Sequence, residues 1–238
     1  MTTTALITGA TSGIGRAVAD KLAQSGVQVI VVGRNVQRGE GTIAQIRAAG
    51  GKAEFIESDL RDASSARSVA KKAVELGRGH VDILINNAGV FPFGPTHEMS
   101  EESFDDVYAL NVKVPFFLVA ELAPLMAERG KGAIVNVSTM VADYGAAGLS
   151  LYGSSKAAIN LLTKAWAAEY GPKGVRVNAV SPGPTRTEGT AAMGDALQQL
   201  AAQAPAGRPA ARPPFRSNNL VGRPVTFADW PLLVPSVP

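Results

Sequence analysis

The sequence predicts a doubly wound α/β fold, in which helices cover both faces of one parallel sheet. Three observations support this fold class. Short apolar runs alternate with stretches of helical spacing six times along the chain. The runs are rich in Val, Ile and Leu, as in strands that are buried on both faces. The intervening segments are long enough to be crossover helices, which consecutive parallel strands require.

Each element follows from a local pattern. The expected strands span residues 4–8, 27–32, 53–56, 81–85, 133–137 and 175–180. The expected helices span residues 15–24, 37–49, 63–76, 101–127 and 152–170. Glycines at positions 26 and 50 supply end signals for the first two helices. Pro115 and Pro124 can bend or interrupt the long fourth helix, because proline lacks a backbone N–H and crowds the preceding turn.

Composition excludes several kinds of protein. The chain has 238 residues, of which 46% are hydrophobic and 18% charged, so it can bury a sizeable core. It has no cysteine and only two histidines, which excludes disulfides, thiol nucleophiles and a multi-histidine metal site. The net charge is only +3 without a basic run, so we expect no nucleic-acid partner. No charged leader and no apolar run of 18 residues is seen, so we expect a cytoplasmic protein without a membrane span.

A glycine-rich turn follows the first strand. Residues 8–15 read Thr-Gly-Ala-Thr-Ser-Gly-Ile-Gly and open the first helix. In this arrangement Gly9 permits the turn, Gly13 admits a pyrophosphate to the backbone N–H groups, and Gly15 lets the helix pack on the strand. An ordinary glycine turn is the alternative. The strand before the turn and the helix after it favour dinucleotide binding.

The ends of the next strands indicate which dinucleotide is bound. Arg34 and Asn35 follow the second strand, where an NAD site usually has a carboxylate for the ribose hydroxyls. A guanidinium can instead pair with a 2′-phosphate, so we expect NADP, with NAD less favoured. A solvated Arg34 is the alternative. Asp59, followed by Leu60, can accept from an adenine amino group or cap a helix, and the small residues at 86–89 suit a bound ribose or a turn.

Tyr152 and Lys156 stand four residues apart, on one face of the fifth helix. A phenol normally has a pKa near 10. A nearby ammonium favours the phenolate and lowers that pKa, so the phenol can act as an acid or base near neutrality. An accidental pair on a surface helix is the alternative, and the other motifs make it less favoured.

Taken together, residues 8–15 and 86–89, Asn111, the Tyr152/Lys156 pair and residues 181–183 resemble the short-chain dehydrogenase/reductase family, in its single-domain branch. The resemblance runs from residue 4 to about residue 207. It implies a seven-stranded sheet and reversible hydride transfer between a nicotinamide and a small-molecule alcohol or carbonyl. It also implies a homodimer or homotetramer, whose dimer contact uses the helices at 101–127 and 152–170.

The resemblance also implies roles for individual residues. Tyr152 would protonate the carbonyl oxygen, Lys156 would bind the nicotinamide ribose and lower the pKa of Tyr152, and Asn111 would hold a water that relays protons. The expected cofactor-binding residues are Gly9, Thr11, Ser12, Gly13, Ile14, Gly15, Arg34, Asn35, Asp59, Leu60, Asn86, Ala88, Gly89, Tyr152, Lys156, Pro182, Gly183, Thr185 and Thr187.

The family's catalytic serine is not in its usual place. It normally lies thirteen residues before the tyrosine, and that position holds Thr139 here. Ser138 lies fourteen residues before it. Either hydroxyl can donate to a substrate oxygen, and the spacing favours Thr139 over Ser138. The residues expected to surround the substrate, among them Phe91, Met140 and Tyr144, are mostly apolar and suggest an uncharged carbonyl compound.

The carboxyl end departs from the family pattern. We expect a catalytic domain over residues 1–207 and a proline-rich, atypical tail over residues 208–238, in which the seventh strand is doubtful. The leading hypothesis is an NADP-dependent oxidoreductase. The alternative is a cofactor-binding protein whose altered tail abolishes turnover. A serine hydrolase is weakly supported, since the sequence has no Gly-x-Ser-x-Gly elbow.

Overall fold

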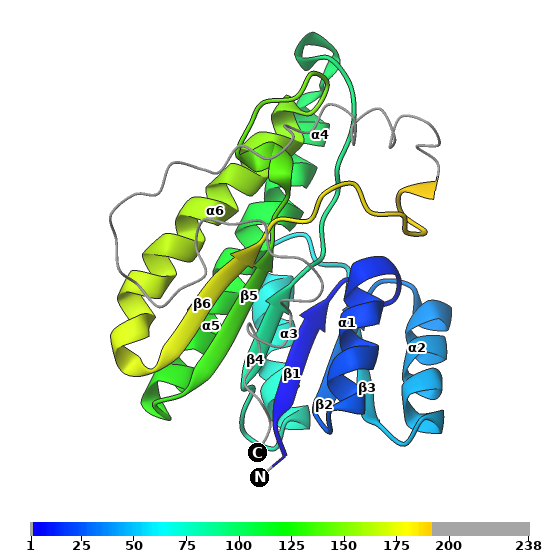
Figure 1. Cartoon of the computed structure of the whole chain (residues 1–238), viewed down its shortest axis with the longest axis vertical. Helices are drawn as coiled ribbons and strands as arrows, with labels where there is room; N and C mark the ends of the chain where they lie inside the picture. Colours follow the sequence, from blue (N-terminus) through cyan, green and yellow to red (C-terminus); the bar gives the residue numbers. More distant parts are fainter. Residues whose placement is uncertain (1, 192–238) are drawn as a thin grey trace.

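The computed structural model describes residues 2–191, and these residues form one six-stranded parallel sheet (Figure 1). Its strands lie in the order β3-β2-β1-β4-β5-β6. Their bounds are β1 Thr4–Thr8, β2 Gln28–Gly33, β3 Lys52–Glu57, β4 Ile83–Asn86, β5 Gly132–Val137 and β6 Val175–Val180. The predicted fold class is confirmed, and each predicted strand is present. The seventh strand and the tail at 208–238 lie outside the described residues.

The central strand shows why the sheet forms. All of β1 is buried, and Leu6 pairs in register with Ile30 of β2 and with Leu84 of β4. Each of these three side chains is fully buried. Side chains that alternate between two covered faces must be apolar on both, which explains the nearly unbroken apolar runs in the sequence.

Within residues 2–191, six α-helices connect or follow the strands: α1 Gly13–Gln24, α2 Val36–Ala48, α3 Ala63–Leu76, α4 Glu101–Tyr108, α5 Val114–Glu128 and α6 Ser150–Tyr170. Three of them, α2, α3 and α4, begin at side-chain caps. Asn35 accepts from the backbone N–H of Arg38 at the start of α2. Asp62 and Ser65 form a capping box at the start of α3. Such caps satisfy N–H groups that have no partner within the helix.

The long helix predicted over 101–127 is divided. A π-helical turn, Ala109–Lys113, separates α4 from α5. Pro115 lies in the first turn of α5, where its missing N–H is tolerated, and Pro124 lies inside that helix. The interruption therefore comes before the prolines rather than at them. It places Asn111, which is fully buried, inside the π turn.

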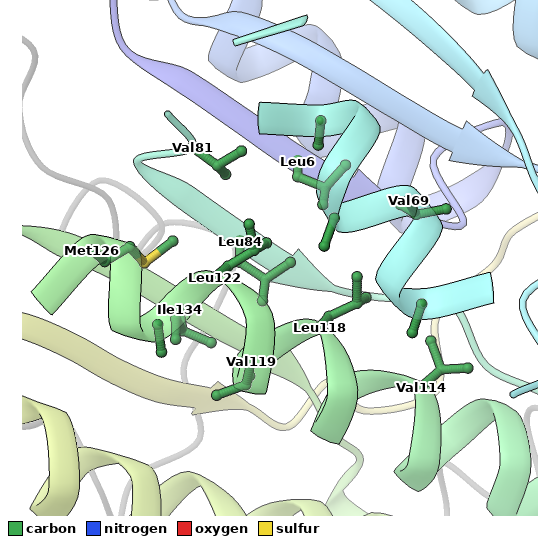
Figure 2. Packing of buried hydrophobic residues seen from close by; sticks show 14 of the residues in the cluster. Leu6, Val69, Val81, Leu84, Val114, Leu118, Val119, Leu122, Met126 and Ile134 are labelled. Atoms are coloured by element: carbon green, nitrogen blue, oxygen red, sulfur yellow. The ribbon is translucent and has the colours of Figure 1, made fainter. Parts of the chain in front are cut away.

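The two faces of the sheet are covered by different helices. Buried residues of α1 and α2 pack with Ala5, Ile7 and their neighbours on one face. On the other face, Val69 of α3 and Leu118 and Leu122 of α5 meet Leu6, Leu84 and Ile134 of the strands, as Figure 2 shows.

The segment Glu101–Glu128 is long and apolar enough to cross a membrane by length and composition. In this fold its apolar side chains pack inside the protein. Val114, Leu118, Leu122 and Met126 are buried against the sheet and α3. The segment is therefore a core helix of this fold.

The strand order sets the position of a ligand crevice. β1 lies between β2 and β4, so the chain winds outward from β1 to one edge and then from β4 to the other. In open parallel sheets, ligands bind outside the carboxyl ends of the strands at this reversal.

Candidate active site

A cleft of about 420 Å³ lies at the carboxyl ends of the strands. Every strand contributes to its lining through the segment that follows it. The predicted residues that line it are Gly9, Thr11, Ser12, Gly13, Ile14, Arg34, Asp59, Leu60, Ala88, Gly89, Ser138, Thr139, Tyr152, Lys156, Pro182, Gly183, Thr185 and Thr187. The predicted residues Gly15, Asn35, Asn86 and Asn111 are not among its lining residues.

The turn after β1 requires its glycines. Gly9 and Gly13 have φ values of 63° and 53°, in the left-handed region that favours glycine. A Cβ on Gly9 would lie 2.8 Å from the Ala88 Cα, and one on Gly15 would lie 2.5 Å from the Gly9 carbonyl oxygen. Gly15 therefore serves the packing of helix against turn, while Gly9 and Gly13 face the cleft.

The segment that follows β4 holds this turn in place. The Thr8 hydroxyl accepts from the backbone N–H groups of Asn87 and Ala88, each at 3.0 Å. The Asn87 amide donates to the carbonyls of Thr8 and Gly9, at 2.9 and 3.0 Å. Asn87, which belongs to the polar stretch 86–89, also lines the cleft. Asn86 points elsewhere, since it donates to the buried Asn136 side chain at 2.8 Å.

The end of the cleft beside β2 and β3 carries the charged side chains. Arg34 and Arg38 both line it. Arg38 was missed, although it stands four residues after Arg34, about one helical turn further on. Asn35 caps α2 through the Arg38 N–H and does not line the cleft. Asp59 lines the cleft and forms an ion pair with Arg61.

Tyr152 lies at the other end of the cleft, beside Thr139. Both side chains line the cleft, and the Thr139 hydroxyl acts on the phenol as a hydrogen-bonding neighbour. Burial raises the pKa of the Tyr152 phenol, and the Thr139 hydrogen bond opposes that rise. The hydroxyl of Ser138 donates to the Lys156 carbonyl at 3.4 Å instead. The geometry thus brings Thr139 to the phenol, as the thirteen-residue spacing predicts.

Lys156 is 4% exposed. Its Nζ donates to the Val137 carbonyl at 2.7 Å and lies 6.0 Å from the centre of the Tyr152 ring. Burial lowers the pKa of Lys156 to about 8. In this structure desolvation dominates the pKa of the Tyr152 phenol and the ammonium is turned to a backbone carbonyl, so the lowering of that pKa by Lys156 stays a prediction.

Asn111 supports this end of the site from behind. Its side chain accepts from the Val90 N–H at 3.0 Å and donates to the Val90 carbonyl at 2.9 Å and to Ser155 at 3.1 Å. Gly89 lies between Asn111 and Lys156, since a Cβ there would be 3.1 Å from the Asn111 Oδ1 and 3.4 Å from the Lys156 Nζ. Asn111 thus fixes the backbone that passes Lys156.

The loop after β6 closes over the glycine turn. Pro182, Gly183, Thr185 and Thr187 line the cleft from this side. The carboxylate of Glu188 accepts from the Gly13 N–H at 3.0 Å. No local pattern could reveal this contact, because 175 residues separate its partners.

The residues present fit a phosphate-bearing nucleotide. The Gly13 N–H already holds one anionic group, the Glu188 carboxylate, at the start of a helix. Within residues 2–191, no group of three or more His, Asp or Glu side chains could hold a metal ion. The backbone N–H groups of the turn offer an anion site among these residues.

Comparison with known proteins agrees with this architecture. The family model for short chain dehydrogenases matches residues 3–198. The chain therefore belongs to the short chain dehydrogenase family, which is a family of oxidoreductases.

Individual relatives cover most of the chain. An uncharacterized oxidoreductase of Thermotoga maritima is 44% identical over 77% of this chain and 72% of its own length. The 2,5-dichloro-2,5-cyclohexadiene-1,4-diol dehydrogenase LinX of Sphingobium indicum is 35% identical over 98% of this chain and 88% of its own. A short-chain dehydrogenase of Sphingobium yanoikuyae, solved with NADPH, is 35% identical over 78% of this chain and 72% of that one, with a TM-score of 0.74.

Proposed function

We propose that the protein is an NADP-dependent oxidoreductase of carbonyl and alcohol substrates, in which Tyr152 is the general acid and base. The observation that carries the proposal is the partly buried Tyr152 phenol, beside Thr139, at one end of a cleft whose opposite end holds a glycine turn and two arginines. When bound, the nicotinamide would supply and accept the hydride. The chain's own residues would bind, orient and move the proton.

Arg34 and Arg38 support the preference for NADP. Both line the cleft where β2 ends, and the β2 segment ends at Gly33 without a carboxylate. Two guanidinium groups suit a 2′-phosphate, whereas NAD sites usually place an acid at this point. The Sphingobium yanoikuyae relative solved with NADPH is consistent with this choice.

Tyr152 would give its proton to the carbonyl oxygen in reduction and take it back in oxidation. Its raised pKa keeps the phenol protonated at neutral pH, which suits the reductive direction. The Thr139 hydroxyl would donate to the same substrate oxygen. Lys156 would bind the nicotinamide ribose and return a proton to Tyr152. Because the Asn111 side chain is taken by Val90 and Ser155, a relay water would have to bind its backbone.

The substrate end of the cleft is apolar. Phe91, Met140, Val141, Tyr144 and Leu149 line it around Tyr152. Of the charged side chains among the described lining residues, Arg34, Arg38 and Asp59 follow β2 and β3, and only Lys156 is near the phenol. We therefore assign an uncharged carbonyl compound with an apolar or aromatic substituent as the substrate class. LinX, named for an uncharged ring diol, is in line with this class.

The assembly would be a homodimer or homotetramer. Phe116 of α5 and Leu161 of α6 are 44% and 68% exposed, on the two helices that the family resemblance assigns to a dimer contact. Exposed apolar side chains of this size on neighbouring helices suit a subunit interface. A cytoplasmic location belongs to the same proposal, with no membrane or nucleic-acid partner.

The alternative of a cofactor-binding protein without turnover is not favoured. Relatives that match most of the chain are named as dehydrogenases and reductases. An active oxidoreductase and a cofactor-binding protein without turnover would both bind the nucleotide in this cleft, and only the first would transfer hydride. One experiment therefore distinguishes them.

Titration calorimetry with NADPH and with NADH, followed by assays of NADPH consumption with a panel of neutral ketones, tests the proposal. We expect NADPH to bind roughly tenfold or more tightly than NADH, since a 2′-phosphate adds charge-assisted hydrogen bonds. Replacing both Arg34 and Arg38 by Ala should remove most of that difference. Binding of neither dinucleotide would overturn the proposal, and binding without consumption of any ketone would favour the alternative.

A further inference from the structure

The side chain of Glu188 joins the loop after β6 to the start of α1. Its Oε2 accepts from the Gly13 N–H at 3.0 Å, and its Oε1 accepts from Arg16 at 2.7 Å. Both partners belong to the first turn of α1. Ser12, at the N-cap position of this helix, makes no side-chain capping bond, so the distant carboxylate takes the place of a local cap.

This carboxylate lies where an anion is favoured. The start of a helix carries unpaired N–H groups and the positive end of the helix dipole. Hydrogen bonds from the Glu188 N–H and the Gly13 N–H, together with nearby Arg16, lower the pKa of Glu188, so it is ionised at neutral pH. The neighbouring Thr187 lies close to the turn, since a Cβ on Gly13 would be 3.2 Å from the Thr187 Cβ.

The loop around Glu188 is tied together. Thr190 accepts from the Thr187 N–H and donates to the Thr185 carbonyl, each at 2.8 Å. Thr185 and Thr187 line the cleft. A displacement of Glu188 would therefore carry with it the part of the loop that faces the bound nucleotide.

We propose that Glu188 competes with the phosphates of the dinucleotide for the first turn of α1, and so sets cofactor affinity. This inference rests on the proposed dinucleotide-binding function. Two anions cannot share the Gly13 N–H, and their like charges repel at this distance. Cofactor binding exchanges the carboxylate for a phosphate, releases Arg16 from its ion pair, and frees the loop 185–190 from the glycine turn.

Titration calorimetry with NADPH, without turnover, compares the parent with Glu188→Gln. Glutamine keeps the shape and one acceptor but removes the charge. We expect Glu188→Gln to bind NADPH roughly threefold to tenfold more tightly, which is the range for loss of an exposed ion pair and a charge-assisted hydrogen bond. Inorganic pyrophosphate, titrated alone, should gain affinity in the same direction.

Glu54→Gln is the matched control. Glu54 forms another partly exposed ion pair, with Arg47 at 3.1 Å, and neither residue lines the cleft. It should bind NADPH like the parent. Unchanged or weaker binding by Glu188→Gln would overturn the inference, since a weaker affinity would make Glu188 a clamp on the bound cofactor. If neither the parent nor the variant binds NADPH or NADH, the proposed function itself fails.

Discussion

Lys156 places an ammonium group where burial opposes its charge. Only 4% of the residue is exposed, and its pKa falls to about 8. An unfolded chain holds the same lysine at a pKa near 10.4. The unfolded state therefore binds more protons between about pH 8 and pH 10.4, and the free energy of unfolding should rise with pH across that window. Burial of Lys156 therefore costs stability at neutral pH.

Lys156→Met should stabilise the fold and abolish turnover. We expect the free energy of unfolding to rise by about 1–3 kcal/mol at pH 7, because a buried charge is removed. Urea unfolding at pH 7 and pH 10 measures the free energy of unfolding. This free energy should rise with pH in the parent and not in the variant. Lys164→Met changes an exposed lysine on the same helix and serves as control. A less stable Lys156→Met protein, with the pH dependence retained, would contradict this account.

Phe91 should determine which carbonyl compounds are accepted. Its ring lies 6.0 Å from that of Tyr152, edge on, in the cleft lining. Phe91→Ala should raise KM for aryl ketones roughly tenfold, the factor expected for loss of an aromatic contact with the substrate, and leave NADPH affinity unchanged. Phe93→Ala, at a residue that is 62% exposed and outside the lining, is the control. Equal KM values for the two variants would remove Phe91 from the substrate site.

At the scale of elements, the glycine turn and the interrupted helix place the site. The Gly15 position has no room for a Cβ, which would meet the Gly9 carbonyl at 2.5 Å. Gly41, inside α2, has nothing within 4 Å of the same atom. We therefore expect an alanine to destabilise the fold at the first position and to stabilise it at the second.

Gly15→Ala should lower the free energy of unfolding by about 2 kcal/mol or more, because the backbone of the turn must shift. Gly41→Ala should raise it by about 0.5–1 kcal/mol, because alanine favours a helix. Chemical denaturation of both variants gives the comparison. If both variants changed the free energy of unfolding in the same direction, the turn would not be tightly packed on the helix at Gly15.

How far the sequence predicts these elements depends on the range of the interactions. Nearly unbroken apolar runs predicted the central strands β1, β2, β4 and β5, because strands that are buried on both faces leave few polar positions. The edge strands β3 and β6 carry polar residues such as Glu54 and Asn178 within their apolar pattern. The π turn at 109–113 was not predicted, since no glycine or proline lies within it and its cause is packing around Asn111. Likewise, the choice of Asn86 over Asn87 for the cleft depended on a one-residue register that only neighbouring strands define.

At the scale of the whole molecule, the helices that cover the sheet differ in how much apolar surface they leave exposed. α3 and α5 bury one side in the core that Figure 2 shows, yet Phe116 and Leu161 remain exposed on α5 and α6. Figure 1 shows α5 and α6 beside β5 and β6. The apolar side chains that face outward here suit a second copy of the chain.

Leu161→Asp should therefore give a smaller assembly than the parent, because a charge would be buried in the interface. Light scattering coupled to size exclusion measures the mass. Val36→Asp, at a half-exposed apolar residue of α2, should leave the assembly unchanged. A parent that is already monomeric, or a Leu161→Asp variant of unaltered mass, would remove this interface.

The proton-transfer role of the Tyr152 phenol is tested by measuring NADPH consumption by Tyr152→Phe. The substitution removes one hydroxyl and nothing else, and Tyr170→Phe, at the far end of the same helix, is the control. We expect kcat to fall about 100-fold or more for Tyr152→Phe, with NADPH affinity kept, and parent activity for Tyr170→Phe. Reduction of a neutral ketone by Tyr152→Phe at the rate of the parent would contradict it.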